Sequence, residues 1–218
     1  MKYEVFQLPR VSDKAFSYAT SVTPWLRHPL WAWLGARPAL AQHTAAEHAA
    51  IKRWATNRRS LAEIGVAEGV SARAIREAMA EDATLYLIDP FHLSRVPAFN
   101  FTRRAANRMI ANCLRGNVVW VQLFSYDAAA TWDTSLDFLM IDGDHTYRAV
   151  QRDWDGWSRF VAPGGVVSLH DARIFKGGWT TPEYGPVRLV DRLFRNQKIP
   201  GWEVVEEIHS LVVIERQK

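Results

Sequence analysis

One apolar stretch that ends in acids and a histidine constrains the fold more than any other part of the chain. The four residues Phe138–Ile141 are all apolar, and Asp142, Asp144 and His145 follow them. A run without polar alternation is typical of a central parallel strand covered on both faces. Open α/β sheets place their ligands at the carboxyl ends of such strands. We therefore predict an α/β sheet with functional side chains where this strand ends.

Further strands and helices alternate along the chain. The predicted strands cover 61–64, 84–89, 118–124, 136–141, 166–171, 202–205 and 211–214. The predicted helices cover 43–57, 72–80, 101–115, 147–161 and 187–196. Ser71 is a plausible N-cap for the second of these helices. Because the last two strands are joined by a short connection, we expect them to pair antiparallel. The pattern predicts a doubly wound, mostly parallel seven-stranded sheet.

The N-terminal part differs in character from this alternating region. Residues 1–60 contain helix-compatible pieces. Within them the three tryptophans Trp25, Trp31 and Trp33 lie near prolines. We predict a helical cap over 1–60 and a cofactor-binding domain over 61–218. The tryptophans either pack the cap onto the domain or line a substrate entrance, and large aromatic side chains suit both roles.

A glycine-bearing turn follows the first predicted strand. Gly65 and Gly69 let the backbone approach a ligand closely at a helix N-terminus. Ala67 stands where a dinucleotide fingerprint has its second glycine, so the turn departs from the nicotinamide pattern. Glu63 suits a ligand with a cationic amino group, and Asp89, after the next strand, can accept hydrogen bonds from both ribose hydroxyls. Together they predict a nucleoside that carries an amino acid.

With these residues the chain resembles the class I S-adenosylmethionine-dependent methyltransferases. The segment Glu63–Gly69 is similar to their first motif, and Asp89 to their ribose-binding acid. The resemblance implies a Rossmann-like methyltransferase fold and S-adenosylmethionine as the cofactor. The cofactor-binding residues that it implies are Glu63, Gly65, Ala67, Gly69, Asp89 and Asp142, with Ser125, Tyr126 and Asp127 near the adenine.

Two later motifs narrow this resemblance. The segments Ile141–Tyr147 and Pro163–Asp171 are similar to the small-molecule O-methyltransferase branch, which includes macrolide-sugar and cephalosporin-type tailoring enzymes. The implied substrate is a hydroxyl of a small molecule, either a sugar or an aromatic natural product. Trp179 and Tyr184, in the loop Arg173–Pro186, are candidates for the wall of the substrate site.

Asp142 and Asp171 end neighbouring predicted strands, so their carboxylates can converge on one divalent cation, Mg²⁺ or a similar ion. In metal-dependent relatives the residue before Asp171 is usually acidic, whereas here it is His170. Imidazole is a poor partner for Mg²⁺ and an acceptable one for softer metals. The candidate metal ligands are thus Asp142, Asp171 and His170. The alternative is a hydrogen-bonded pair of acids without a metal.

His145 is the candidate general base and Asp142 the second candidate catalytic residue. An imidazole with an ordinary pKa of about 6.5 can take a proton from an acceptor hydroxyl near neutral pH. The alternative is a histidine that only hydrogen-bonds the start of the next helix. Methyl transfer depends mainly on aligning the acceptor oxygen with the methyl group, so a mild effect of substituting His145 would fit that alternative.

Composition limits the other functional classes. The chain has 218 residues, 48% hydrophobic and 23% charged, as expected of a globular protein with one catalytic domain. The net charge is +4, but Lys and Arg are scattered, so we expect no nucleic-acid partner. The single cysteine, Cys113, fits a reduced thiol. No apolar run is long enough for a membrane span, and no signal-peptide pattern is present. We therefore expect a cytoplasmic protein, and a homo-oligomer is compatible with the sequence.

Three competing functions remain open at this point. A nicotinamide-dependent oxidoreductase shares the sheet and an acid like Asp89, although the glycine fingerprint and Glu63 count against it. A non-catalytic cofactor-binding protein can keep the same fold, because fold does not fix function. A nucleic-acid methyltransferase is disfavoured, since the fourth strand lacks the Asn/Asp-Pro-Pro-aromatic run typical of amino-group methylation.

Overall fold

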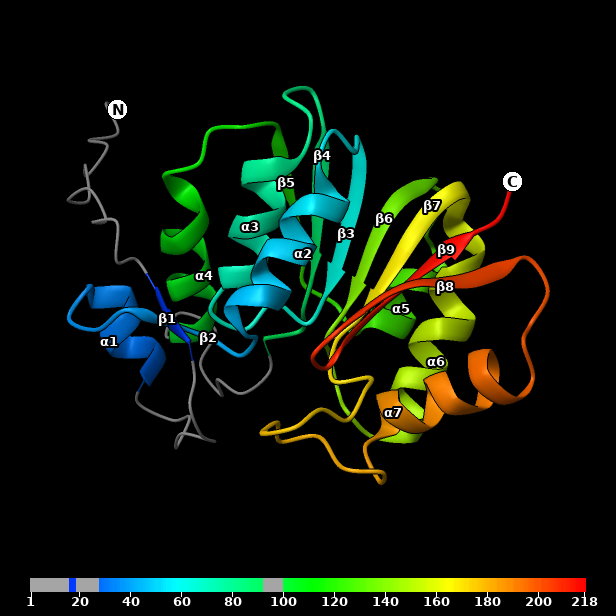
Figure 1. The fold of residues 1–218 in the computed structure, drawn as a ribbon. Coiled ribbons are helices and arrows are strands. Elements are labelled where there is room, and N and C mark those ends of the chain that lie inside the picture. Colours follow the sequence, from blue (N-terminus) through cyan, green and yellow to red (C-terminus); the bar gives the residue numbers. More distant parts are fainter. Residues whose placement is uncertain (1–15, 19–27, 92–99) are drawn as a thin grey trace.

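The computed structural model describes residues 16–18, 28–91 and 100–218, which fold around one twisted sheet (Figure 1). The sheet has seven strands in the order β5-β4-β3-β6-β7-β9-β8. The strands are β3 Ser60–Ile64, β4 Thr84–Ile88, β5 Asn117–Val121, β6 Leu136–Ile141, β7 Val161–Leu169, β8 Trp202–Ile208 and β9 Leu211–Arg216. The five strands from β5 to β7 are parallel, and β9 is antiparallel to both β7 and β8. The predicted doubly wound sheet is confirmed.

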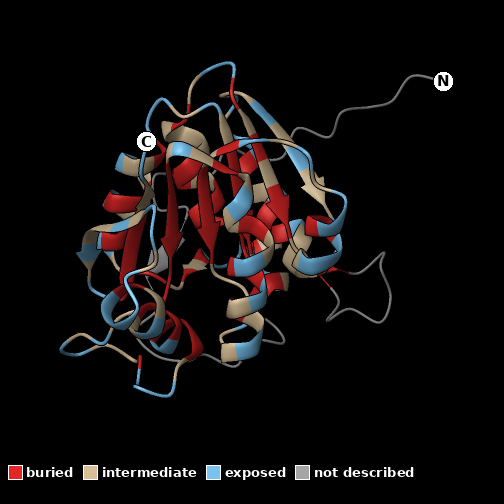
Figure 2. Cartoon of the chain, turned by 90° about the vertical axis from the view of Figure 1, so that its right-hand side faces the viewer, coloured by how far each residue is buried: buried red, intermediate tan, exposed pale blue. Residues whose placement is uncertain are grey.

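Helices cover both faces of this sheet. Those that pack on one face are α2 Ala45–Ala55, α3 Val70–Ala78 and α4 Phe101–Ala111. Those that pack on the other are α5 Ser125–Ala130, α6 Tyr147–Trp157 and α7 Gly185–Val190, and α7 continues as a π-helical turn over Asp191–Asn196. Figure 2 shows the buried residues concentrated in the strands and on the inner sides of the helices.

The central strand β6 has the two-sided burial that its sequence predicts. Phe138 and Met140 belong to the core cluster under α2 and α3, whereas Leu139 and Ile141 belong to the cluster under α6 and α7. None of the four side chains is more than 3% exposed. Burial of each contributes on the order of 1.5–3 kcal/mol relative to exposure. The acids that follow β6 therefore start from a rigid strand.

Several element boundaries differ from the predicted ones. The N-cap of α3 is Gly69, in a left-handed conformation, and not Ser71, which is buried in the first turn. Helix α4 ends at Ala111 and not at Arg115, because the Arg76 guanidinium binds the carbonyls that follow, including those of Arg115 and Gly116. A peptide chain turned toward that guanidinium cannot continue the helix.

The region after β6 also differs from the prediction. Helix α6 ends at Trp157, a 3-10 turn follows over Ser158–Phe160, and Val161 begins β7 by pairing with Leu136. Sheet pairing thus outweighs the helical periodicity that Val161 continues in the sequence. Helix α5 was not predicted, because its six residues are too few for a periodic signal.

The N-terminal segment contributes its own small layer. Helix α1 His28–Leu34 and strand β2 Ala39–Ala41 lie beside α3 and α4, and β2 pairs in parallel with β1 Phe16–Tyr18. A pair of short strands therefore accompanies the predicted cap helix. Helix α2 packs into the same core as the sheet, so the division at residue 60 remains a prediction. Trp33 stacks on Phe101, and Trp25 lies outside the described residues.

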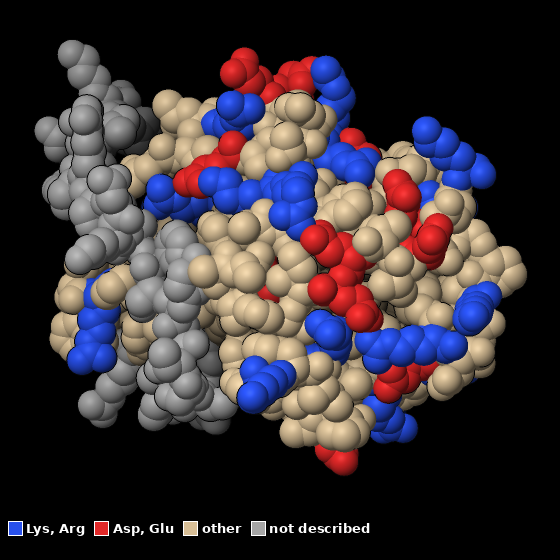
Figure 3. All heavy atoms as spheres, in the orientation of Figure 1, with Lys and Arg blue, Asp and Glu red and all other residues tan. Residues whose placement is uncertain are grey.

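The surface agrees with the scattered charge of the sequence. On the face drawn in Figure 3, acidic and basic side chains are interspersed. None of the helices in 28–91 and 100–218 has the length and apolar character needed to cross a lipid bilayer.

The turn from β3 to α3 packs backbone to backbone against the end of β6. Gly65 has a φ of 84°, and a Cβ atom there would lie 2.2 Å from the Asp142 carbonyl oxygen. Gly177 has a nearly equal φ of 83°, but nothing lies within 4 Å of its Cβ position. A side chain is conformationally unfavourable at both glycines, and only at Gly65 would it also clash with neighbouring backbone.

We predict that Gly65→Ala destabilises the protein much more than Gly177→Ala. Both substitutions incur about 1 kcal/mol for a left-handed alanine, and Gly65→Ala adds overpacking against backbone that raises the loss to about 3 kcal/mol or more. Urea unfolding of both variants measures the difference in free energy. Equal losses would mean that the backbone at Gly65 does not lie this close to the Asp142 carbonyl.

Candidate active site

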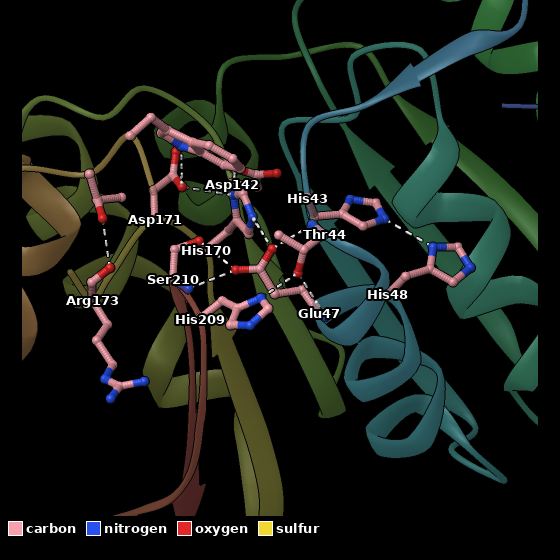
Figure 4. Close-up of polar contacts among 12 residues, drawn as sticks. His43, Thr44, Glu47, His48, Asp142, His170, Asp171, Arg173, His209 and Ser210 are labelled. Carbon is pink, nitrogen blue, oxygen red and sulfur yellow. Dashed lines mark hydrogen bonds and ion pairs between the residues drawn. The ribbon is translucent and has the colours of Figure 1, made fainter. Parts of the chain in front are cut away.

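Four polar side chains meet where β6 and β7 end. The Asp142 carboxylate is 3.1 Å from His170 Nδ1 and 3.4 Å from His145 Nε2. The Asp171 carboxylate is 3.4 Å from His145 Nε2 and 3.6 Å from His170 Nδ1. The structure thus brings together the predicted metal ligands and the predicted base, and we call these four residues the polar cluster. Figure 4 shows three of them, Asp142, His170 and Asp171.

A fifth residue, Glu47 in α2, reaches the same cluster from the opposite side. Its carboxylate is completely buried and lies 3.7 Å from His170 Nε2. It also accepts hydrogen bonds from the backbone N–H and hydroxyl of Ser210, at 2.7 and 2.6 Å, and from the N–H of Thr44 at 2.6 Å. Sequence reasoning missed Glu47, although Thr44 and Glu47 form a capping box that marks the start of α2.

The carboxylates decide the charge of His170. Burial disfavours its imidazolium, but Asp142, Glu47 and Asp171 outweigh burial and hold the pKa of His170 well above its usual value. Burial raises the pKa of Asp171. For Asp142 burial acts in the same direction, but the charge of His170 and the hydrogen bonds from both histidines outweigh it and lower the pKa. The neighbouring carboxylates therefore favour the protonated, cationic form of His170.

The loop after β7 closes one side of the cluster with aromatic rings. Trp179 donates its indole N–H to the Asp171 carboxylate at 2.8 Å. The Tyr184 ring lies 5.9 Å from the His145 ring, and the N–H of Gly185 binds the His145 carbonyl at 2.9 Å. Asp171 itself has a φ of 51°, an unfavourable value for a non-glycine residue. Both aromatic residues predicted as a substrate wall thus border the cluster.

The turn Gly65–Gly69, between β3 and α3, is called the cofactor turn here because the sequence predicts the cofactor at this position. Glu63, near the end of β3, lies beside it as a buried acid without a bonded partner. It is 0% exposed, and neither carboxylate oxygen makes a hydrogen bond of ordinary geometry within the described residues. Burial raises the pKa of Glu63 well above its usual value, which the nearby Ser71 hydroxyl only partly offsets. Buried polar groups are nearly always bonded, so this exception points to a missing ligand.

Asp89 organises the backbone of the same turn. Its carboxylate accepts hydrogen bonds from the N–H groups of Val66 at 2.9 Å and Ala67 at 3.4 Å. It also accepts one from Phe91 at 2.8 Å. A carboxylate with acceptor capacity left at the end of β4 can bind ribose hydroxyls. The predicted cofactor residues Glu63, Gly65, Ala67, Gly69 and Asp89 are therefore gathered around one turn next to Asp142.

The three residues predicted near the adenine lie in α5. The Ser125 hydroxyl donates to the buried Asp153 carboxylate of α6. Tyr126 is 41% exposed, lies under the Arg152 guanidinium and lines a groove of about 680 Å³ between α5 and α6. Asp127 is exposed. The groove contains no residue of the polar cluster, so the structure does not bring Tyr126 or Asp127 to that cluster, and the adenine contacts remain a prediction.

Similarity to known proteins indicates the family to which this chain belongs. A family model described as a methyltransferase domain matches residues 62–172, which include the cofactor turn and the polar cluster but not Glu47. The chain belongs to this methyltransferase family. The expected likeness to class I S-adenosylmethionine-dependent methyltransferases is confirmed, and it favours methyl transfer over a nicotinamide-dependent reaction.

Solved structures of methyltransferases share the fold at low sequence identity. The O-methyltransferase TomG from Streptomyces achromogenes, involved in tomaymycin synthesis and in complex with S-adenosylmethionine, has a TM-score of 0.64 at 17% identity, over 91% of this chain and 92% of TomG. A Bacillus cereus O-methyltransferase in complex with S-adenosylhomocysteine has a TM-score of 0.59 at 13% identity, over 87% and 89%. An rRNA methylase from Streptococcus thermophilus has a TM-score of 0.55 at 9% identity, over 82% and 100%. These likenesses establish the fold and leave the acceptor open.

Asp153, which binds Ser125 under α5, generates a stability prediction. Burial is the largest cause that raises the pKa of Asp153, from 3.8 to about 6. Between these values the folded state binds more protons than the unfolded state, so the stability contribution of Asp153 falls as pH rises. We expect Asp153→Asn to be nearly neutral at pH 4 and stabilising by about 2–3 kcal/mol at pH 7.5.

Urea unfolding at the two pH values measures this difference. Asp155→Asn, a substitution on the exposed side of the same helix, is the control for loss of a negative charge. An Asp153→Asn effect that is the same at pH 4 and pH 7.5 would contradict the raised pKa.

Proposed function

We propose that the protein transfers the methyl group of S-adenosylmethionine to a hydroxyl of a small molecule. The observation that carries the proposal is the position of the polar cluster directly beside the cofactor turn. A Cβ on Gly65 would touch the Asp142 carbonyl, and Asp142 lies 3.4 Å from His145 Nε2. S-adenosylmethionine held at this turn would supply the methyl group, and His145 would be the neighbouring candidate base.

Each group has a defined task in this proposal. Asp89 binds the ribose hydroxyls, and Glu63 binds the cationic amino group and so gains the partner that it lacks. His145 Nε2 takes the proton of the acceptor hydroxyl while the oxygen bonds to the methyl carbon. The methyl group would come from S-adenosylmethionine, whose carbon–sulfur bond would break with the electron pair left on sulfur, so that S-adenosylhomocysteine is the product. Asp142 and Asp171, each 3.4 Å from His145 Nε2, stabilise the imidazolium that results.

The acceptor that fits best is a sugar or an aromatic natural product. Trp179 and Tyr184 border the cluster with flat apolar faces, which suit either ring. TomG, an O-methyltransferase of natural-product synthesis, has the same fold. On the face drawn in Figure 3, the described acidic and basic side chains are interspersed and form no basic track for a nucleic acid. A cytoplasmic location and the absence of a nucleic-acid partner remain part of the proposal.

A divalent metal can be part of the proposal only if the side chains of the polar cluster suit its coordination. Asp142, His145 and His170 offer ligand atoms that all lie within 4.8 Å of one another, and Asp171 lies beside them. With an ion bound, His145 would be a ligand and not the base, and the ion would activate the acceptor hydroxyl in its place. The neighbouring donors are 3.1–3.6 Å apart, near the spacing of roughly 3.3 Å expected around a tetrahedral ion with bonds of about 2.0–2.1 Å. Two imidazoles favour zinc or a similar transition metal over Mg²⁺. Such an ion supplies Lewis acidity toward the acceptor oxygen.

Calorimetry with S-adenosylhomocysteine and NAD tests the cofactor assignment. We expect S-adenosylhomocysteine to bind and Asp89→Asn to weaken it by about tenfold, the effect of losing a charged acceptor. Heat from NAD alone would overturn the proposal. Binding without methylation of any sugar or aromatic hydroxyl, with or without added metal, would support a non-catalytic cofactor-binding protein.

Substitution of His145 tests the base. We expect His145→Gln to lower kcat by about 10²-fold, the lower end for general-base catalysis, with little change in S-adenosylhomocysteine affinity. Steady-state kinetics and calorimetry provide the two readouts. A loss of less than tenfold would assign the rate to alignment of the substrates and not to His145.

Metal binding is tested without reference to activity. Co²⁺ absorbs visible light in a way that reports tetrahedral imidazole and carboxylate ligands, so a Co²⁺ titration of the wild-type protein is expected to give an intense band that Zn²⁺ displaces and Mg²⁺ does not. His170→Ala, which removes one imidazole, is expected to lose the band. A wild-type protein without the band, or a band that Mg²⁺ displaces, would overturn the assignment.

A further inference from the structure

The cofactor turn contains a second buried acid, Glu68, that points away from the cofactor side. It is 2% exposed. One carboxylate oxygen lies 2.8 Å from Nδ1 of His28 in α1, and the other accepts the backbone N–H of Leu40 in β2 at 2.9 Å. Because an ionised carboxylate only accepts, His28 Nδ1 is the donor. Glu68 therefore joins the turn to two elements that precede the sheet by about 20 residues or more.

Apolar contacts join the same parts of the molecule. Ala32 of α1 and Ala39 and Ala41 of β2 form a small core with Val70, the first residue of α3. Ala105 and Met109 of α4 complete this core. The segment 28–41 thus covers the outer side of the helix N-terminus at which the cofactor turn ends (Figure 1).

The turn is held from its two sides by different acids. Asp89 binds the N–H groups of Val66 and Ala67 on the cofactor side, while Glu68 binds the segment 28–41 on the other. Ala67 and Gly69 have φ values of 45° and 81°, so the backbone on either side of Glu68 is in a left-handed conformation. Few alternative conformations are available to such a turn.

We propose that Glu68 is a positioning residue that couples cofactor binding to the N-terminal segment 28–41. If this segment detaches, the buried carboxylate loses both hydrogen bonds, so release of the segment and distortion of the turn are one event. A cofactor that stabilises the turn must then oppose release of the segment, and by linkage the attached segment must strengthen cofactor binding. The inference rests on the proposed cofactor turn.

Hydrogen exchange followed by mass spectrometry tests the coupling in the full chain. In the wild-type protein, saturating S-adenosylhomocysteine is expected to slow exchange of peptides from 28–41 by at least fivefold. In Glu68→Gln, which keeps the side-chain volume and removes the charge, this slowing is expected to fall below twofold. Calorimetry is expected to give about tenfold weaker S-adenosylhomocysteine binding.

Two controls separate coupling from general loosening. Glu77→Gln removes an acid of α3 that binds Arg73 of the same helix and Lys52 of α2, and it is expected to keep both wild-type readouts. Arg104→Ala removes the guanidinium that lies 4.9 Å from the Trp33 ring, so exchange in 28–41 speeds up with and without ligand while the ligand-dependent slowing remains.

The outcomes are distinct. Binding of S-adenosylhomocysteine to the wild-type protein without slower exchange in 28–41 would overturn the coupling and leave the proposed function intact. Wild-type slowing in Glu68→Gln would overturn the role of Glu68. Absence of binding to the wild-type protein would overturn the proposed function together with the coupling. If Glu68→Gln does not fold, Glu68→Asp, which keeps the charge but is one methylene too short for both bonds, takes its place with the same expected loss.

Discussion

The arrangement of the active-site edge depends on the need to balance three carboxylates, of which those of Glu47 and Asp171 are buried and that of Asp142 is partly buried. Glu47, Asp142 and Asp171 come from α2, β6 and β7, and all approach the imidazole of His170. Unbalanced charges cost several kcal/mol each in such surroundings. A protonated His170 with its hydrogen-bonded neighbours meets that need. Since Ser210, in the turn between β8 and β9, also binds Glu47, one electrostatic requirement fixes four elements of the fold relative to one another.

Under the proposed metal binding, this requirement would make a metal and His170 compete for one role. A divalent cation bound by Asp142 and Asp171 would supply the positive charge that His170 carries without it. Binding must then displace a proton from His170, because imidazole ligates metals in its neutral form. Glu47 holds the pKa of His170 upward and so opposes that exchange. The same acid that secures α2 thus sets how readily the polar cluster accepts an ion.

Much of the fold follows from local patterns, and the errors arise where distant contacts decide. The strands were predictable because their apolar runs and terminal acids are continuous in the sequence, as in Phe138–Asp142. The end of α4 was not, because it depends on Arg76, some 35 to 40 residues earlier. Likewise, Val161 continues a helical period in the sequence, but pairing with Leu136 determines its state.

The residues of the candidate site also divide into those that local sequence patterns predict and those that depend on distant contacts. Asp142, His145, His170 and Asp171 were predictable because strand ends in a parallel sheet share one edge. Glu47 and Glu68 were not, because their partners Ser210 and His28 lie 163 and 40 residues away. A capping box locates Glu47 at a helix start, but no local pattern reveals its distant partner.

The contrast between two completely buried glutamates distinguishes a structural acid from one that awaits a ligand. Glu47 is bonded by Thr44 and Ser210, and although burial acts against its charge, these bonds and His170 bring the pKa of Glu47 down to about 2. Glu63 is equally buried but has no such bonds, and its pKa is raised. Within the described residues, no hydrogen bond of ordinary geometry replaces those that water would give to its oxygens. A donor from outside the chain can supply one. Under the proposed function, the cationic amino group of the cofactor would be that donor, so the contrast between Glu47 and Glu63 supports the proposed role of Glu63.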